Sequence, residues 1–177
     1  MITNIKYGLL GGVLLAVNAI AFYSLDIGNK LFYTVWIILQ LTIIIFSIFL
    51  GVKEKKRIVF QNSISYREAI VTALVINFLA AIISSVSIFL FINFNQEVND
   101  KLYRSNIEQT ASQMKEMEFK EADIQKHIQL IKNDSSIAAY PAWNNLKGIL
   151  FLGLAISLIV TAILRSEVSK APEIKRD

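Results

Sequence analysis

Few side chains in this 177-residue sequence are of the types that carry out acid–base, nucleophilic or metal chemistry. There is no cysteine, so neither a thiolate metal site nor a cysteine nucleophile can form. The one histidine, His127, cannot build a metal site alone, and with Asp123 it makes at best a pair on a helix surface. Ser84 and Ser85 lie in a run without a His or Lys that could serve as a base. We therefore expect no catalytic, cofactor-binding or metal-binding residues.

Four long runs of the sequence contain no charged residue, and these runs predict the elements that would position its polar side chains. Hydrophobic residues make up 54% of the chain and charged residues only 18%, below the roughly 25% of soluble domains. The charge-free runs are residues 7–25, 31–52, 69–96 and 148–164. About 20 apolar residues in a helix cross the roughly 30 Å hydrocarbon core of a bilayer. The sequence therefore predicts an all-α membrane protein with four transmembrane helices, at about 7–25, 31–52, 69–94 and 146–164.

Two other interpretations of these runs are possible. Membrane strands close into a barrel and alternate apolar with polar residues, but residues 43–46 read Ile-Ile-Ile-Phe without alternation. Ala19-Ile20-Ala21 has the form of a signal-peptidase site. It lies inside its apolar run, however, whereas a cleavage site follows an apolar core of about 7–15 residues. We therefore expect four helices, with the first run retained as a span.

Basic residues indicate the orientation in the membrane. Those assigned to the cytoplasmic side are Lys6, Lys53, Lys55, Lys56, Arg57, Arg67, Arg165, Lys170, Lys175 and Arg176. Short loops rich in Lys and Arg stay in the cytoplasm, so both termini are predicted to face the cytoplasm. The same pattern explains the calculated pI of 9.3 without nucleic acid. The cluster Lys53, Lys55, Lys56 and Arg57 is a candidate contact for anionic lipid or a partner, although orientation alone also accounts for it.

Residues 97–147 form a predicted extracytoplasmic insertion in a single polytopic domain that covers residues 1–177. Apolar residues recur there mostly at helical spacing, which predicts two amphipathic helices joined near residues 118–122. These apolar residues are Val98, Leu102, Ile107, Ala111, Met114, Met117, Ile124, Ile128 and Ile131. Eight acidic and seven basic residues balance the charge, so no obvious anionic target exists. The pair is either a platform for a partner or the bilayer surface, or a cap that links two spans.

Small and weakly polar residues recur at helical spacing within the spans. They are Gly8, Gly12 and Ala16 in the first, Asn77 and Ser84 in the third, and Gly153, Ser157 and Thr161 in the fourth. Such residues let helix backbones approach closely in lipid, where no hydrophobic force drives association. They form a candidate packing interface, either with a partner or second copy, or among the protein's own four helices. Asn18, Gln40 and Asn77 are expected to form hydrogen bonds inside that bundle.

Ionisable residues are missing from the spans, and this bears on transport. Such residues mark most ion pathways and proton relays in membranes. Their absence argues against an ion-coupled transporter but leaves open passive movement of a neutral solute.

Three stretches give the chain a family resemblance: residues 6–12 (KYGLLGG), 64–69 (ISYREA) and 117–122 (MEFKEA). Over nearly its whole length the chain resembles the domain-of-unknown-function 4199 family of bacterial four-span inner-membrane proteins. The resemblance implies this architecture and supplies no reaction, and it also implies an association with a polyprenyl-phosphate glycosyltransferase. The leading hypothesis is a non-enzymatic accessory subunit or scaffold with a membrane-protein or identical partner. The alternatives are a membrane partner of that glycosyltransferase and a small transporter or channel component.

Overall fold

A computed structural model describes residues 2–25, 30–133 and 138–165, except for the side chains of residues 30, 31, 132 and 133. These residues form six helices and no strand: α1 (Ile2–Ser24), α2 (Lys30–Ile58), α3 (Tyr66–Phe94), α4 (Gln96–Glu116), α5 (Glu121–Asn133) and α6 (Ala139–Leu164). The all-helical prediction is therefore confirmed. Residues 26–29 of the loop between the first two spans, and the basic residues Lys170, Lys175 and Arg176, lie outside the described residues.

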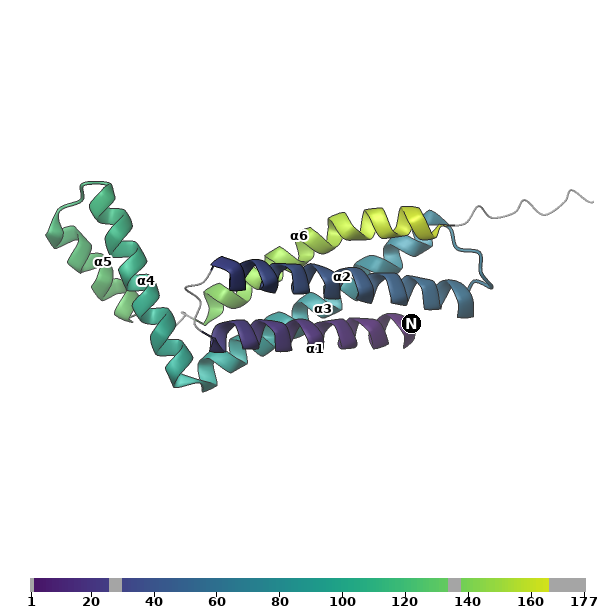
Figure 1. Cartoon of the computed structure of the whole chain (residues 1–177), viewed down its shortest axis with the longest axis horizontal. Coiled ribbons are helices and arrows are strands. Elements are labelled where there is room, and N and C mark those ends of the chain that lie inside the picture. Colours follow the sequence, from purple (N-terminus) through teal and green to yellow (C-terminus); the bar gives the residue numbers. More distant parts are fainter. Residues whose placement is uncertain (1, 26–29, 134–137, 166–177) are drawn as a thin grey trace, which may run out of the picture.

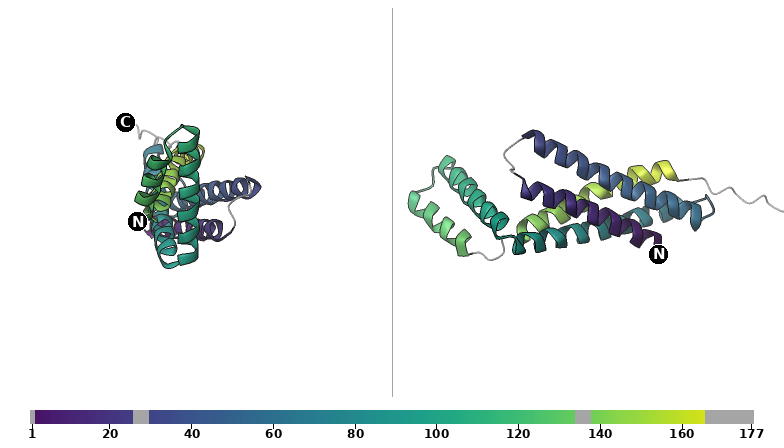
Figure 2. Two further views of the ribbon diagram at one scale, coloured as in Figure 1. Left: turned by 90° about the vertical axis from the view of Figure 1, so that its left-hand side faces the viewer. Right: turned by 60° about the horizontal axis from the view of Figure 1, so that its bottom comes forward.

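Helices α1, α2, α3 and α6 lie side by side and form one bundle (Figures 1 and 2). All four are long and apolar enough to cross a membrane, in agreement with the predicted number of spans. The helices continue past the charge-free runs, because a helix does not have to end where the hydrocarbon ends. The largest difference between a predicted and an observed helix start is in α6, which begins at Ala139 instead of the predicted residue 146. Pro141 falls in its first turn, where a missing backbone N–H costs nothing.

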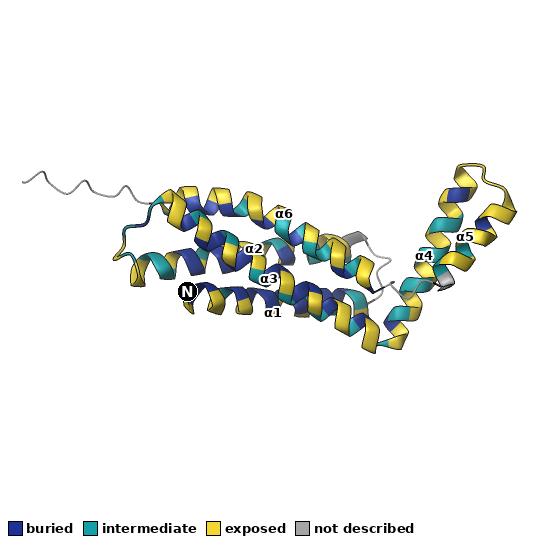
Figure 3. Ribbon diagram, turned by 180° about the vertical axis from the view of Figure 1, so that it is seen from behind, coloured by how far each residue is buried: buried dark blue, intermediate teal, exposed yellow. Residues whose placement is uncertain are grey.

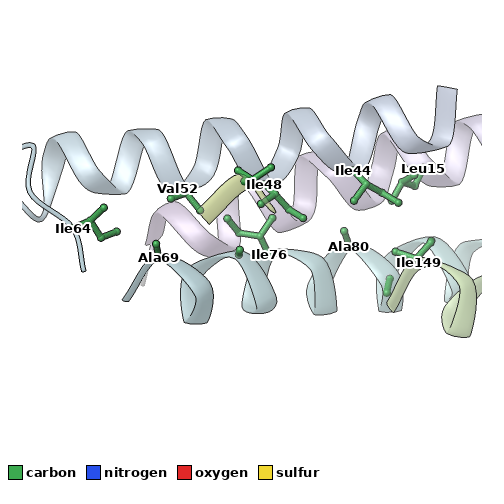
Figure 4. Close-up of a cluster of buried hydrophobic side chains, with 12 residues drawn as sticks. Leu15, Ile44, Ile48, Val52, Ile64, Ala69, Ile76, Ala80 and Ile149 are labelled. Carbon is green, nitrogen blue, oxygen red and sulfur yellow. The ribbon is translucent and has the colours of Figure 1, made fainter. Parts of the chain in front are cut away.

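Helix α3 is the central element of the bundle. It packs along α1 and α6 and also contacts α2, while α2 contacts α1 and α6. Figure 4 shows Ile48 of α2 and Ile76 of α3 in the layer between these two helices. Both side chains are almost fully buried, as is Ile149 of α6. Small residues of α3, such as Ala69 and Ala80, let the neighbouring helices approach it closely.

Helices α4 and α5 form a hairpin beyond one end of the bundle (Figure 1). Asn95 ends α3 and begins α4, where its side-chain oxygen accepts a hydrogen bond of 3.2 Å from the Val98 backbone N–H. In the turn between α4 and α5, Glu118 adopts a left-handed conformation with φ of 61°. Figure 3 shows that most of the hairpin surface is exposed. The buried exceptions include Met114 on α4 and Ile124 on α5.

Candidate packing interface and basic cluster

The small-residue stripe of α1 faces α3 within the same chain. A Cβ atom added to Gly8 would lie 2.7 Å from the Cβ of Leu79, and one added to Gly12 would lie 2.7 Å from the Cβ of Ile83. Ala16 is also buried. These contacts are shorter than real Cβ atoms tolerate, so glycine is needed at both positions. The stripe is therefore occupied by α3 and is not on the outer face of the bundle.

Two further glycines, which helical spacing did not single out, allow close packing. A Cβ at Gly11 would lie 2.6 Å from the Ser47 Oγ, and one at Gly51 would collide with Ile76 of α3. These positions bring α2 close to α1 and α3. Glycine is rare in this chain, with seven residues in total, so the sequence alone could have marked these glycines as candidate positions of close packing.

Asn77 and Gly153 join α3 to α6 at one point. The Asn77 amide group occupies the space that a Cβ on Gly153 would need. Asn77 is 3% exposed, and its Nδ2 lies 3.4 Å from the backbone oxygen of Leu150, to which it donates. Its Oδ1 has no hydrogen-bond partner among the described residues. The Asn77 side chain is thus held in place by close packing against Gly153 at least as much as by its hydrogen bond to Leu150.

Asn145 connects the same two helices nearer the hairpin. Its Nδ2 donates to the Ser84 Oγ and the Ser85 Oγ, each at 3.1 Å. Ser84 is fully buried. The two hydroxyls therefore act as acceptors for an interhelical amide, which is a packing role. Asn145 was not predicted, because it lies just before the charge-free run that marked the fourth span.

Ser157 and Thr161 satisfy their hydroxyl groups within α6. The Ser157 Oγ donates to the Gly153 backbone oxygen at 2.6 Å, and the Thr161 Oγ1 donates to the Ser157 backbone oxygen at 2.6 Å. Both residues are fully buried. Small side chains bonded to the preceding turn leave a compact surface for helix packing. Among the other predicted polar residues, Asn18 donates weakly to the Trp36 backbone oxygen at 3.5 Å, and Gln40 is buried.

The basic cluster at the end of α2 divides into two pairs. The Lys55 Nζ donates to the Thr72 Oγ1 at 3.0 Å, and the Lys56 Nζ donates at 3.0 Å to the backbone oxygen of Leu164, the last residue of α6. A cation at a helix C-terminus complements the carbonyl groups that lack a partner there. Lys53 and Arg57 are exposed. The predicted contact with lipid or a partner would therefore fall chiefly to these two residues.

An ionic contact that no sequence pattern predicted ties the beginning of α1 to the end of α2. The Lys6 Nζ lies 3.1 and 3.2 Å from the Glu54 carboxylate oxygens, and the Tyr7 hydroxyl donates to the same carboxylate. Lys6 and Glu54 lie outside the charge-free runs that cross the hydrocarbon. Hydrogen bonds from Tyr7 and Lys6 hold the pKa of Glu54 below its usual value, and the bond to Glu54 raises the pKa of Lys6.

The structure also places the remaining chemical candidates. His127 is exposed on α5. Within the described part of the chain, no three His, Cys, Asp or Glu side chains gather into a possible metal site. A cavity inside the bundle, lined by residues such as Ser47, Ile76 and Ala80, has a volume of about 10 Å³. That is roughly the space for one water molecule.

Comparisons with known proteins establish the family of the chain. No curated protein and no solved structure matches the chain. The family model described as "Protein of unknown function (DUF4199)" matches residues 6–166, which include all six helices except the first turn of α1. The chain therefore belongs to the DUF4199 family.

Proposed function

We propose that this protein is a non-enzymatic accessory subunit or scaffold of a bacterial inner membrane. The bundle anchors the α4–α5 hairpin on the extracytoplasmic side, where the hairpin contacts a membrane-protein partner. One observation carries the proposal. The small and polar residues of the spans are used inside the chain, whereas the hairpin leaves most of its side chains exposed.

The small size of the cavity described inside the bundle favours a scaffold over a channel. The cavity of about 10 Å³ beside Ser47 and Ala80 is too small for a continuous water-filled path. Elsewhere in the bundle, polar side chains bond to other helices or to their own helix, as Asn145 and Ser157 do. Passage of a solute would require these contacts to separate.

The tip of the hairpin is the proposed partner contact. Met117 is 69% exposed and Phe119 is 49% exposed, although both are large and apolar. Charged residues of both signs surround them, including Glu118 and Lys120. Apolar residues inside a polar rim are typical of protein interfaces.

The orientation is tested by thiol labelling. The chain has no cysteine, so one introduced Cys is its single thiol. We expect Lys120→Cys in the hairpin to react with a membrane-impermeant maleimide on intact spheroplasts. Asn62→Cys, between α2 and α3, should react only after the membrane is opened. The reverse order of labelling would contradict the proposed orientation.

The partner role is tested by a photo-crosslinking residue at Phe119 in native membranes. Phe151 of α6, 77% exposed on the bundle, is the matched control because it is also an exposed phenylalanine. We expect a reproducible protein adduct from position 119 and lipid adducts from position 151. Protein adducts from position 151 alone, or none at either site, would contradict a hairpin-mediated scaffold.

A further inference from the structure

A polar pocket, the junction pocket, lies between the hairpin and the bundle. Helix α4 passes the end of the bundle that carries the last turn of α1 and the first turn of α6 (Figure 1). These three helices line the junction pocket, which has a volume of about 210 Å³. Among its lining residues are Tyr23, Asn106, Gln109, Tyr140 and Asn144. Because Tyr23 is near the end of the charge-free run 7–25 and Asn144 shortly precedes the run 148–164, the pocket lies at the boundary between membrane and water.

Neutral hydrogen-bonding groups line the junction pocket from two helices. Asn106 and Gln109 of α4 and Asn144 of α6 each carry a carboxamide, which both donates and accepts hydrogen bonds. None of these three amides bonds to another described residue, so their capacity is available to a ligand. No charged side chain of the described residues lines the pocket. A phosphate, a carboxylate or an amine would lose hydration there without gaining an ion pair, whereas a neutral ligand with several hydroxyl groups would gain partners.

Two tyrosine rings add apolar surface to the same pocket. Tyr140 of α6 is 66% exposed, so its ring is accessible to a ligand. Tyr23 of α1 is half-buried, and its ring packs edge-on against Phe22 at a centroid distance of 5.5 Å. A tyrosine combines an apolar ring with a polar hydroxyl. A hexose has the matching pattern, because the face of its ring carries C–H groups and its edge carries hydroxyls.

The size and the walls of the junction pocket argue against other neutral ligands. Its volume of about 210 Å³ is below the roughly 300–1,000 Å³ of pockets for drug-sized molecules, so it has room for a single small ring. Its helical walls offer no strand edge to which an extended peptide could add main-chain hydrogen bonds. An acyl chain would leave the three carboxamides without partners.

We propose that the junction pocket binds one neutral hexose unit. The sugar ring lies against Tyr140, and its hydroxyls bond to the carboxamides of Asn106 and Gln109. Because the pocket is at the membrane boundary, the hexose belongs either to a free saccharide or to the head group of a glycolipid. The proposal does not depend on the partner contact at the hairpin tip, since Met117 and Phe119 do not line the pocket.

The first experiment is saturation-transfer NMR of the full chain in nanodiscs of sugar-free phospholipids. Alkyl glucosides and maltosides are left out at every step, because their head groups are themselves hexoses. The probes are glucose, galactose, mannose and N-acetylglucosamine, with glucosamine as the cationic and glucuronate as the anionic analogue. We expect transfer to at least one neutral sugar. The charged analogues should bind at least about fivefold more weakly, because an unpaired group in the pocket is costly.

Matched variants assign the binding to the junction pocket. Tyr140→Ala should weaken it by about three- to tenfold, whereas Tyr140→Phe keeps the ring and should bind like the wild type. Gln109→Leu removes a carboxamide at similar volume and should weaken binding by about two- to tenfold. Gln113→Leu is the control, because Gln113 is exposed on α4 one turn beyond the pocket and does not line it.

The second experiment tests the glycolipid source by hydrogen–deuterium exchange of α4. Nanodiscs contain monoglucosyl or monogalactosyl diacylglycerol, and diacylglycerol without a sugar is the control. A ligand that joins α4 to α1 and α6 should slow the opening of the hairpin, by about tenfold at ten times its Kd. Protection by a glycolipid without NMR transfer to free sugars would identify a head group, and the converse would identify a free saccharide.

Three results would each overturn the proposal. The first is the absence of both NMR transfer and glycolipid protection, which would mean that the junction pocket holds water alone. The second is equal binding of neutral and charged sugars, because the uncharged lining would then select nothing. The third is the same binding in Gln109→Leu as in Gln113→Leu, because the sugar would then bind elsewhere.

Discussion

The bundle and the hairpin are both made of helices and both bury apolar side chains, but they differ in the residues that they expose. Helix α3 buries small and polar residues such as Ala73, Asn77 and Ser84, and exposes large apolar ones such as Phe78. In the hairpin, charged residues are exposed while Met114 and Ile124 are buried. In lipid, close approach of backbones holds helices together, whereas in water burial of apolar area does.

The hairpin is held in place by fewer contacts than the bundle helices. It buries few large side chains and contacts the bundle mainly where α4 follows α3. Regions with few buried apolar contacts open at lower free energy than the rest of a protein. We therefore expect the hairpin to open without the bundle.

The largest expected effect comes from Ile124→Ala in the hairpin. Ile124 is 1% exposed, and removing such a side chain costs about 2–5 kcal/mol. We expect trypsin to cut at Lys120 and Lys126 at least tenfold faster in nanodiscs, with unchanged thermal unfolding of the bundle. Leu130→Ala is the control, because Leu130 is 59% exposed. A matching loss of bundle stability would contradict the independence of the two regions.

Gly153→Ala should destabilise the bundle by about 1–3 kcal/mol, the usual cost of overpacking. The added Cβ would overlap the Asn77 amide. Gly148→Ala is a close control in the same helix, since nothing lies within 4 Å of a Cβ at that position. Unfolding in mixed micelles of increasing SDS content measures both variants. Adding Asn77→Ala to Gly153→Ala should recover part of the lost stability, because it removes the amide that the added Cβ overlaps. Equal stability of Gly153→Ala and Gly148→Ala would rule out tight packing at Gly153.

Asn145→Ala removes the amide that bridges α3 and α6. We expect a loss of about 0.6–1.7 kcal/mol, from the average to the largest value measured for hydrogen bonds between membrane helices. Asn144→Ala changes an exposed neighbour and should have little effect on the same SDS unfolding curve. If both variants unfold alike, the hydrogen bonds to Ser84 and Ser85 contribute nothing measurable.

The smallest effect concerns pH. Because the pKa of Glu54 is lowered in the folded state, its ionised form adds stability above the ordinary value of 4.5, and this contribution is lost as the pH falls through the folded-state pKa. Tyr7→Phe removes the principal hydrogen bond and should reduce this acid-dependent loss. Thermal unfolding at a series of pH values compares the variant with the wild type. An unchanged pH profile would show that Tyr7 does not stabilise the carboxylate.

The sequence was sufficient to predict the spans, because each span needs an uninterrupted apolar run and any charge in the hydrocarbon is costly. The start of α6 at Ala139 was missed because Tyr140, Asn144 and Lys147 make its first turns polar. The beginning of α3, by contrast, carries a direct signal in the sequence. Ser65 and Glu68 form a reciprocal capping box, and the Ser-x-x-Glu pattern is typical of such a helix start.

The candidate site was less predictable than the fold. Helical spacing identified the small residues Gly8, Gly12 and Gly153, but spacing alone does not tell which helix lies opposite. The partners of Asn145 and of Glu54 lie about 50 to 60 residues away in sequence, so only the assembled bundle brings them together.

The most direct test of the difference between hairpin and bundle is hydrogen–deuterium exchange of the full chain in nanodiscs. We predict that amides of α4 and α5 exchange through local opening, while those of α3 exchange only with unfolding of the whole bundle. Adding denaturant at low concentration should then leave hairpin exchange nearly unchanged. Exchange in the hairpin as slow as in α3, with the same denaturant dependence, would contradict the independence of the two regions.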